Sequence, residues 1–166
     1  MEVLTLKEIA KALNTKTDFD VQINAVCIDT RKITKGCLFI CIKGERFDAH
    51  QFANEALSLG AAAVMISEVN GAFVKVENTS KALLDLSAYY RSKFDIPVVA
   101  LTGSVGKTTT KEFTYLVVNS EFNAIKTQGN LNNEIGLPQM LFQIDNSTEA
   151  AVIEPFWRNS PTCNCY

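Results

Sequence analysis

The sequence predicts an α/β fold of two successive units, the second of which is a parallel sheet with a phosphate-binding loop. Three observations support this prediction. Short apolar runs typical of strands alternate with segments in which apolar residues recur every three or four positions, as on one face of a helix. Pro97 interrupts the pattern after a long helical segment, which indicates a boundary. Beyond it, an apolar strand-like run leads through a glycine-containing turn into another helix.

The composition is that of an ordinary globular protein. The chain has 166 residues, of which 47% are hydrophobic and 20% are charged, enough for one domain or two small ones. A net charge of -2 provides no basic field for nucleic acid. No apolar run approaches the ~20 residues of a membrane span, and the first residues do not resemble a signal peptide. We therefore expect a cytoplasmic protein that neither inserts into membranes nor binds nucleic acid.

The first unit is expected to span residues 1–95 and to alternate helices with strands. Thr5 and Glu8 have the spacing of a capping box, so the first helix should begin there. Asp48 can cap a second helix, and Gly60 is a suitable residue to end it. The expected helices are 5–13, 48–60 and a third that is capped by Thr79 or Ser80 and ends near 94; the expected strands are 23–28, 37–42, 61–66 and 73–76.

The second unit begins at residue 96. Residues 98–101 are apolar at every position, which is typical of a central parallel strand with both faces covered. The helix after the glycine turn places Phe113, Leu116 and Val117 on one side. Further strands are expected at 122–126 and 150–153, with a short helix around 134–141 between them.

Residues 102–110, TGSVGKTTT, carry the strongest chemical signal. Glycines let the backbone curl so that its N–H groups point at phosphate oxygens, and the following helix presents its positive end to the same anion. Lys107 can reach terminal phosphates, and the Thr108 hydroxyl is placed to bind Mg²⁺. Leu101 occupies the position of the first glycine of the full pattern, so only the shorter G-x-x-G-K-T form is present. The alternative is a glycine turn that happens to precede a lysine.

Three other segments have a recognisable pattern: DTR at 29–31 followed by GCLF at 36–39, KGERFDAH at 43–50, and TQGNLNNEIGLP at 127–138. Together with the phosphate loop they resemble the Mur ligases, the family of peptidoglycan precursor ligases. Residues 127–138 are similar to the member that adds D-alanyl-D-alanine to UDP-N-acetylmuramoyl-tripeptide. The resemblance extends from residue 1 to about 154.

The resemblance implies a small N-terminal α/β domain that binds the UDP end of the substrate, at 1–95, and the start of a P-loop parallel-sheet ATPase domain, at 96–154. It implies an ATP-dependent ligase whose substrate carboxylate is phosphorylated to an acyl phosphate. The amine of D-alanyl-D-alanine then attacks, and ADP and phosphate are released. The implied cofactors are ATP and Mg²⁺, the partners are these small molecules, and a monomer is expected.

The resemblance also implies roles for single residues. Lys107 and Glu154 are the expected catalytic residues, and Glu154 would bind Mg²⁺ together with Thr108. The alternative for Glu154 is a solvated carboxylate at the end of a strand. The residues expected to bind ATP are Gly103, Ser104, Val105, Gly106, Lys107, Thr108 and Thr109.

A second set is expected to bind the UDP-linked substrate: Thr30, Arg31, Lys43, Gly44, Glu45, Arg46, Asp48, Asn130, Asn132 and Asn133. Alternatives remain for several of them. Residues 29–31 could be a polar turn, Arg46 a solvated loop charge, and the three asparagines a loop and helix cap. His50 is expected to be a polar residue of the second helix rather than a ligand.

Residues 155–166 depart from the continuation that the family would have. Our hypothesis is a shifted reading frame or a damaged gene; a deliberate short form is the alternative. Because later parts of the ATP domain are missing, residues 98–101 should keep an unpaired edge, and the chain alone is expected to be inactive. Competing interpretations are a non-catalytic fragment that binds UDP-sugar and nucleotide, the sister ligase that adds another amino acid, and an unrelated P-loop kinase or GTPase.

Overall fold

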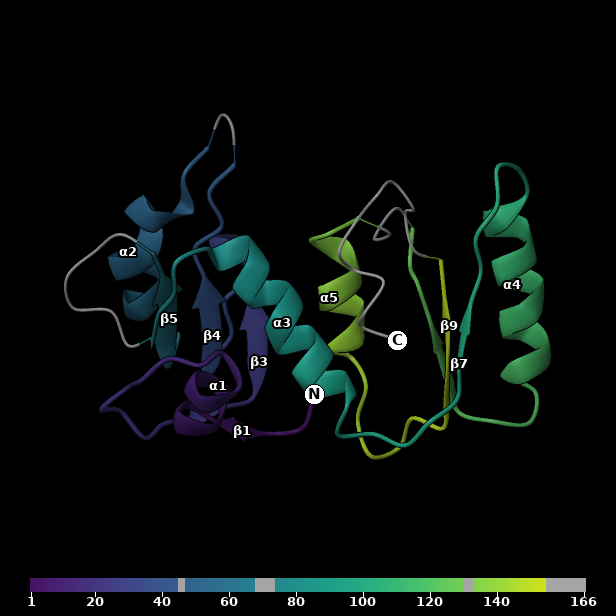
Figure 1. The fold of residues 1–166 in the computed structure, drawn as a ribbon, viewed down its shortest axis with the longest axis horizontal. Helices are drawn as coiled ribbons and strands as arrows, with labels where there is room; N and C mark the ends of the chain where they lie inside the picture. Colours follow the sequence, from purple (N-terminus) through teal and green to yellow (C-terminus); the bar gives the residue numbers. More distant parts are fainter. Residues whose placement is uncertain (45–46, 68–73, 130–132, 155–166) are drawn as a thin grey trace. The chain divides into compact units, whose positions relative to one another are not determined.

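The computed structural model describes residues 1–44, 47–67, 74–129 and 133–154. The chain divides into two compact units, Met1–Leu86 and Ser87–Tyr166, and the division falls within helix α3 (Thr79–Arg91). Both units are mixtures of helices and parallel strands, as the sequence predicts (Figure 1). Each unit has its own sheet, so each is described by itself.

The first unit is built on a four-stranded parallel sheet in the order β3-β4-β5-β6. Its strands are β3 (Ala25–Cys27), β4 (Cys37–Ile40), β5 (Ala63–Ile66) and β6 (Val74–Lys75). Every residue of β4 and β5 is buried, because both are central strands with both faces covered. A short antiparallel pair, β1 (Leu4–Thr5) with β2 (Gln22–Ile23), was not expected from the sequence.

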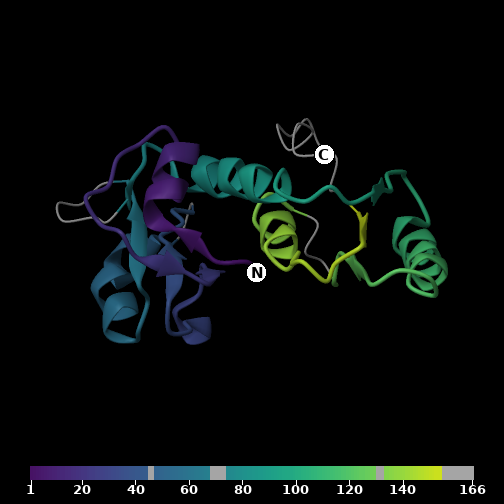
Figure 2. The same ribbon diagram turned by 90° about the horizontal axis from the view of Figure 1, so that it is seen from below.

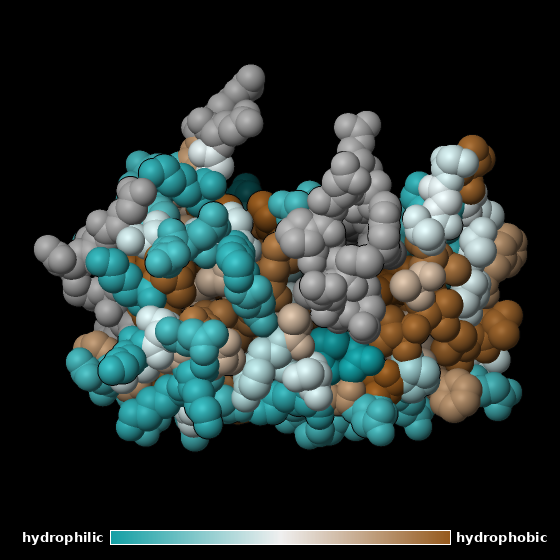
Figure 3. Space-filling model, in the orientation of Figure 1, coloured by the Kyte–Doolittle hydropathy of each residue, from teal (hydrophilic) through white to brown (hydrophobic). Residues whose placement is uncertain are grey.

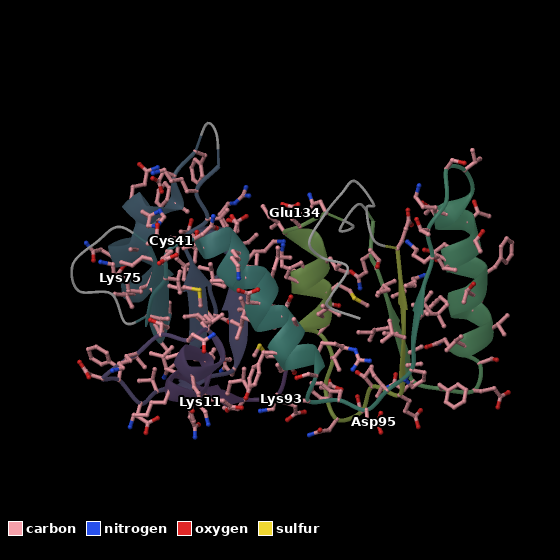
Figure 4. The ribbon with its side chains drawn as sticks, viewed as in Figure 1. Lys11, Cys41, Lys75, Lys93, Asp95 and Glu134 are labelled. Atoms are coloured by element: carbon pink, nitrogen blue, oxygen red, sulfur yellow. The ribbon has the colours of Figure 1, made fainter. Side chains whose placement is uncertain are left out.

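Helices cover both faces of this sheet. Figure 2 shows α1 (Leu6–Ala12) and α3 on one side and α2 (Ala53–Ser58) on the other. Two 3₁₀ turns complete the unit, η1 (Thr30–Lys32) and η2 (Ala49–Phe52). The side chains packed under α2 and η2 form one apolar cluster: Cys37, Phe39, Cys41, Ala49, Ala56, Ala61, Val64 and Ile66. In Figure 4, Cys41 lies inside this unit, whereas Lys11 is on the outer side of α1.

The helix starts follow the capping residues with one exception. Thr5 Oγ1 accepts the Glu8 N–H at 3.2 Å, which confirms the predicted start of α1. Asp48 caps the second helical segment as predicted, but that segment opens as η2 before it becomes α2. The cap of α3 was predicted one or two residues too late, because Asn78 Oδ1 accepts the Lys81 N–H at 2.9 Å.

The second unit has a three-stranded parallel sheet in the order β7-β9-β8. Its strands are β7 (Val98–Ala100), β8 (Ala124–Lys126) and β9 (Ala150–Ile153). Among the described residues β7 is an edge strand, which confirms the expected unpaired edge of 98–101, although its apolar run is typical of a central strand. β9 pairs on both sides and is buried throughout, whereas β7 pairs with β9 alone and Val99 is 38% exposed. The apolar run predicted a strand, but which strands flank it depends on distant segments.

Two helices lie on opposite faces of this sheet, α4 (Lys107–Val118) and α5 (Gly136–Leu141) (Figures 1 and 2). The apolar side of α4 faces away from the sheet: Phe113, Leu116 and Val117 are 66%, 62% and 72% exposed. Figure 3 shows apolar surface over α4 and β7. The side of α4 that faces the sheet instead buries Lys111.

Among the described residues no helix is both long enough and apolar enough to cross a bilayer.

Candidate functional site

The loop between β7 and α4 takes its shape from glycine. Gly106 has a φ of 77° and is the N-cap of α4, a left-handed conformation that a side chain would strain. Its carbonyl accepts both the N–H and the Oγ1 hydroxyl of Thr110, each at 2.9 Å, which closes the first turn. Lys107 Nζ donates to the Gly103 carbonyl at 2.6 Å. The lysine therefore lies along the loop that precedes it, and Val105 at the tip is 91% exposed.

Thr108 and Glu154 meet beside this loop although they are far apart in the chain. Thr108 Oγ1 donates to Glu154, 3.1 Å from Oε2 and 3.3 Å from Oε1. Thr108 is in the first turn of α4 and is exposed, whereas Glu154 directly follows β9 and is only 4% exposed. Thr127 Oγ1 accepts the Glu154 N–H at 3.0 Å and so fixes its backbone. A hydroxyl and a carboxylate are thus held together at the carboxyl end of the sheet, where parallel sheets bind ligands.

A buried cation lies behind this pair. Lys111 is 1% exposed, with Nζ 3.8 Å from Glu154 Oε2 and 3.3 Å from Glu112 Oε1. Lys126 also forms an ion pair with Glu112. Neither Lys111 nor Thr127 was singled out from the sequence. The signal available for Lys111 was its spacing, because it follows Lys107 by four residues and lies on the same side of α4.

The donor set suits a hard cation. Mg²⁺ prefers oxygen ligands and is usually bound by one or two carboxylates together with phosphates and water. Thr108 and Glu154 offer a hydroxyl and a carboxylate, and their oxygens already lie 3.1 Å apart. In the described part of the chain no three His, Cys, Asp or Glu side chains gather as an all-protein metal site. The residues therefore fit Mg²⁺ bound together with a phosphate ligand.

The first unit contains a separate cavity of about 450 Å³. One wall is aromatic, because the rings of Phe47 and Phe52 stack with centroids 5.5 Å apart at 19°. The polar lining residues come from the turn after β3. The lining residues are Ile28, Asp29, Thr30, Arg31, Phe39, Phe47, Ala49 and Phe52. The structure thus brings the predicted Thr30 and Arg31 into one cavity with apolar side chains.

Arg31 is held in place by Asp29. Its Nε donates to Asp29 Oδ1 at 3.0 Å and its Nη2 to Oδ2 at 2.7 Å, a two-point ion pair. The Arg31 backbone N–H also donates to Oδ1 at 3.0 Å. The side-chain hydrogen bonds from Arg31, followed by the backbone one, lower the pKa of Asp29 to about 2. The guanidinium remains mostly exposed beside the cavity.

Lys43 and Asp48 lie at the two ends of the next predicted loop. Lys43 Nζ is 3.9 Å from Asp48 Oδ2, and their backbones form an isolated antiparallel bridge. Gly44 donates its N–H to the Phe47 carbonyl at 2.8 Å. Lys43 also lines a smaller hollow of about 180 Å³, which includes Ser67 at the end of β5. The structure pairs Lys43 with Asp48 and does not place either among the residues that line the larger cavity.

His50 connects this loop to the sheet. Its Nδ1 is 2.5 Å from Asp48 Oδ1, and its Nε2 accepts the Ser67 N–H at 3.1 Å. Ser67 Oγ is 2.9 Å from the same Nε2. The Asp48 carboxylate accepts the backbone N–H and the ring N–H of His50, and both hydrogen bonds lower its pKa. Sequence analysis missed this three-residue network because Ser67 is distant in the chain.

The remaining residues predicted to bind the UDP-linked substrate divide into two groups. Asn133 stabilises the turn that leads into α5, since its Oδ1 accepts the N–H groups of Ile135 and Gly136 at 3.2 and 2.7 Å. Glu45, Arg46, Asn130 and Asn132 lie outside the described residues.

Two models of one family match this chain. The "Mur ligase family, catalytic domain" model matches residues 22–91, and the "Mur ligase middle domain" model matches residues 101–155. The first match contains the 450 Å³ cavity, and the second contains the phosphate loop with Thr108 and Glu154.

Proteins of that family are similar in sequence and in structure. An Escherichia coli protein named UDP-N-acetylmuramoyl-tripeptide--D-alanyl-D-alanine ligase is 42% identical over 91% of this chain and 34% of its own length. The structure of MurF from Acinetobacter baumannii is 33% identical, with a TM-score of 0.87 over 93% of this chain and 36% of that one. MurF from Thermotoga maritima, solved in complex with ADP, is 35% identical with a TM-score of 0.71, over 78% of this chain and 31% of that one. The chain thus spans about a third of the length of these relatives. It belongs to the Mur ligase family and contains sequence of the family's N-terminal and middle domains.

Proposed function

We propose that this chain carries the UDP-binding and ATP-binding parts of a ligase that joins D-alanyl-D-alanine to UDP-N-acetylmuramoyl-tripeptide. The observation that carries the proposal is the Thr108 hydroxyl placed on the buried Glu154 carboxylate beside a phosphate loop. The E. coli relative named for this activity supports the choice of substrates. For this chain, which spans 34% of that relative, we expect nucleotide binding.

The ATP phosphates would lie on residues 103–109, with Lys107 on the terminal phosphate. In the proposed reaction a substrate carboxylate oxygen attacks the γ-phosphorus of ATP, the bond from this phosphorus to the β-phosphate oxygen breaks, and ADP leaves as the acyl phosphate forms. The amine of D-alanyl-D-alanine then displaces phosphate, which completes the amide bond. A lysine and backbone N–H groups aimed at the transferred group stabilise the charge that develops on it. The T. maritima relative solved in complex with ADP supports nucleotide binding.

Thr108 and Glu154 would hold Mg²⁺ together with the nucleotide. The ion supplies neutralisation of phosphate charge when it is bound. The chain's own contribution is a prearranged oxygen pair, since the hydroxyl and the carboxylate are already in contact.

The UDP end of the substrate would bind in the first unit. The stacked rings of Phe47 and Phe52 suit a planar base, and Thr30 contributes a hydroxyl to the lining of the same cavity. Arg31 and Lys43 are the cations suited to the diphosphate. The other residues proposed for this substrate are Gly44, Glu45, Arg46, Asp48, Asn130, Asn132 and Asn133.

We further infer that residues 1–95 are the substrate domain and residues 96–154 the start of the ATP-binding domain. Because ATP and UDP-linked precursors are intracellular small molecules, we expect the protein to act in the cytoplasm. A monomer is expected.

The test is calorimetric titration of the chain with Mg-ADP and, separately, with UDP. Lys107→Ala should lose ADP binding and keep UDP binding, whereas Arg31→Ala should do the reverse, so each variant is the folded control for the other ligand. A wild-type chain that binds neither nucleotide would show the proposal to be wrong. Phosphate release that depends on both UDP-N-acetylmuramoyl-tripeptide and D-alanyl-D-alanine would instead show turnover and exclude the non-catalytic alternative.

A further inference from the structure

We propose that Lys111 is a positioning residue that holds the Glu154 carboxylate against Thr108, so that the pair is ready for a nucleotide-bound Mg²⁺. The inference rests on the nucleotide site proposed above and adds to it a residue that does not itself touch the nucleotide or the ion.

The burial of Lys111 is the first observation. A lysine on a helix ordinarily extends its ammonium into water, and burying that charge is costly unless it is paired. On α4 the arrangement is inverted, because Lys111 is 1% exposed while Phe113 and Val117 are 66% and 72% exposed. The sheet-facing side of this helix therefore carries a cation where packing alone would favour an apolar residue.

The position of the Lys111 ammonium is the second observation. Nζ lies 3.8 Å from Glu154 Oε2, the same oxygen to which Thr108 Oγ1 donates at 3.1 Å. The Glu154 backbone is fixed separately, by its N–H bond to Thr127 Oγ1. Without Lys111 the carboxylate would lose its buried cation, and its side chain could turn away from the loop and from the Thr108 hydroxyl.

Electrostatics gives the third step. The phosphates of a nucleotide on residues 103–109 would repel a neighbouring carboxylate, and this repulsion is strong where water is excluded. The Lys111 ammonium offsets this repulsion by attracting the Glu154 carboxylate, and the attraction is effective because both side chains are almost fully buried. Lys111 thus stabilises the Glu154 carboxylate in the position, beside Thr108, from which it would bind Mg²⁺.

Glu112 does not explain the buried lysine. The Glu112 side chain is 45% exposed and already pairs with Lys126. Water therefore solvates part of the Glu112 charge already. Glu154, with a side chain 6% exposed, is the partner that needs a buried cation.

The quantity to measure is the Mg-dependent gain in ADP affinity, the ratio of the Kd in EDTA to the Kd in Mg²⁺, by calorimetry on the full chain. Lys111→Met should reduce this gain by about tenfold, because the buried cation that pairs with the metal ligand is lost. The Kd in EDTA should change by less than about threefold, since no direct phosphate contact is removed. Lys111→Arg should retain part of the gain, and the matched control Glu112→Gln should retain nearly all of it.

A double variant separates positioning from folding. If Lys111 acts through Glu154, Lys111→Met should cause no further loss of the gain in a Glu154→Gln background. This pair also replaces the single variant if Lys111→Met does not fold, because it leaves no unpaired buried charge. A chain that melts earlier but keeps its full Mg-dependent gain, or a double variant that loses more than Glu154→Gln, would overturn the proposal.

A crystal structure of the Lys111→Met chain gives an answer that does not depend on nucleotide. We expect the contact between Thr108 Oγ1 and Glu154 Oε2 to be lost; a contact that stays near 3.1 Å would overturn the positioning role. If the wild-type chain does not bind ADP, the proposed nucleotide site fails, while the crystal structure still decides what Lys111 does.

Discussion

Thr108 Oγ1 lies 3.1 Å from Glu154 Oε2, so the first turn of α4 is joined to the end of β9 by a hydroxyl and a carboxylate. The two residues are separated by 46 positions in the chain, and they meet because β9 runs parallel to β7 and ends beside the loop that follows it. The strand order thus brings a hydroxyl and a carboxylate together at the end of the sheet that suits a phosphate and its cation.

Replacing Thr108 with valine removes this hydroxyl with little change in shape. We expect Thr108→Val to weaken ADP binding in Mg²⁺ by about tenfold, since one ligand and one hydrogen bond are lost. Thr110→Val is the matched control, because the Thr110 hydroxyl donates to the Gly106 carbonyl within the helix. Equal losses in the two variants would argue against a special role for Thr108.

The ion pair of Asp29 and Arg31 predicts a pH dependence with a defined sign. Hydrogen bonds from Arg31 lower the pKa of Asp29 in the folded chain from 3.8 to about 2, so the unfolded chain binds this proton more readily. The stabilisation is therefore present above the unfolded pKa and is lost as the pH falls toward 2. In Arg31→Met the midpoint should rise toward 3.8 but stop short of it, because the backbone N–H still donates to Asp29.

Carbon-detected NMR of the Asp29 carboxyl group measures this midpoint directly. Lys32→Met is the control, since Lys32 contributes only a weaker charge effect to the same pKa. An Asp29 midpoint that does not move in Arg31→Met would contradict the ion pair.

His50 holds the loop of Lys43 and Asp48 to the sheet, so its removal should destabilise the first unit. His50→Ala leaves the Ser67 N–H without its acceptor, and we expect the free energy of unfolding to fall by about 1–3 kcal/mol. Urea denaturation measures the change. Gln51→Ala is the control, because Gln51 makes a single exposed hydrogen bond to Asp48. A loss no larger than that of Gln51→Ala would rule out the connecting role.

Tyr90 has the corresponding role in the second unit. Its buried hydroxyl donates to the Ile144 carbonyl at 2.5 Å, and its ring contacts Phe94 and Phe142. Tyr90→Phe keeps the ring but leaves that carbonyl unpaired, so a loss of about 1–2 kcal/mol in unfolding free energy is expected. Tyr115→Phe, in which the ring over Lys126 is kept, should change stability by less. Thermal melts of both variants measure these losses. A stability loss in Tyr115→Phe as large as that in Tyr90→Phe would contradict the role of the Tyr90 hydrogen bond.

Local signals account for what the sequence predicted correctly. The capping pair Thr5 and Glu8 and the glycine turn before Lys107 each specify the backbone within a few residues. Such patterns do not depend on distant parts of the chain, so the starts of α1 and α4 could be derived from the sequence alone.

Several features that were missed are set by distant segments. The sequence does not indicate that β9 takes the centre of the three-stranded sheet, between β7 and β8. Lys111 is buried beside Glu154, which directly follows β9. The His50 ring accepts a hydrogen bond from Ser67, which directly follows β5. A periodicity argument places each residue on a face of its own element but does not identify what that face meets.

The two strand orders imply that the strands of the two sheets can pair at different stages of synthesis of the chain. The sheet β3-β4-β5-β6 follows chain order, so each new strand can add to the growing edge as it leaves the ribosome. In β7-β9-β8 the middle strand is the last to be made, so neither β7 nor β8 has its hydrogen-bonding neighbour until Ala150–Ile153 emerges. For the time that translation of the intervening residues takes, the nascent second unit exposes unpaired strands, and it is the part of the chain for which a chaperone would have the longest opportunity to bind.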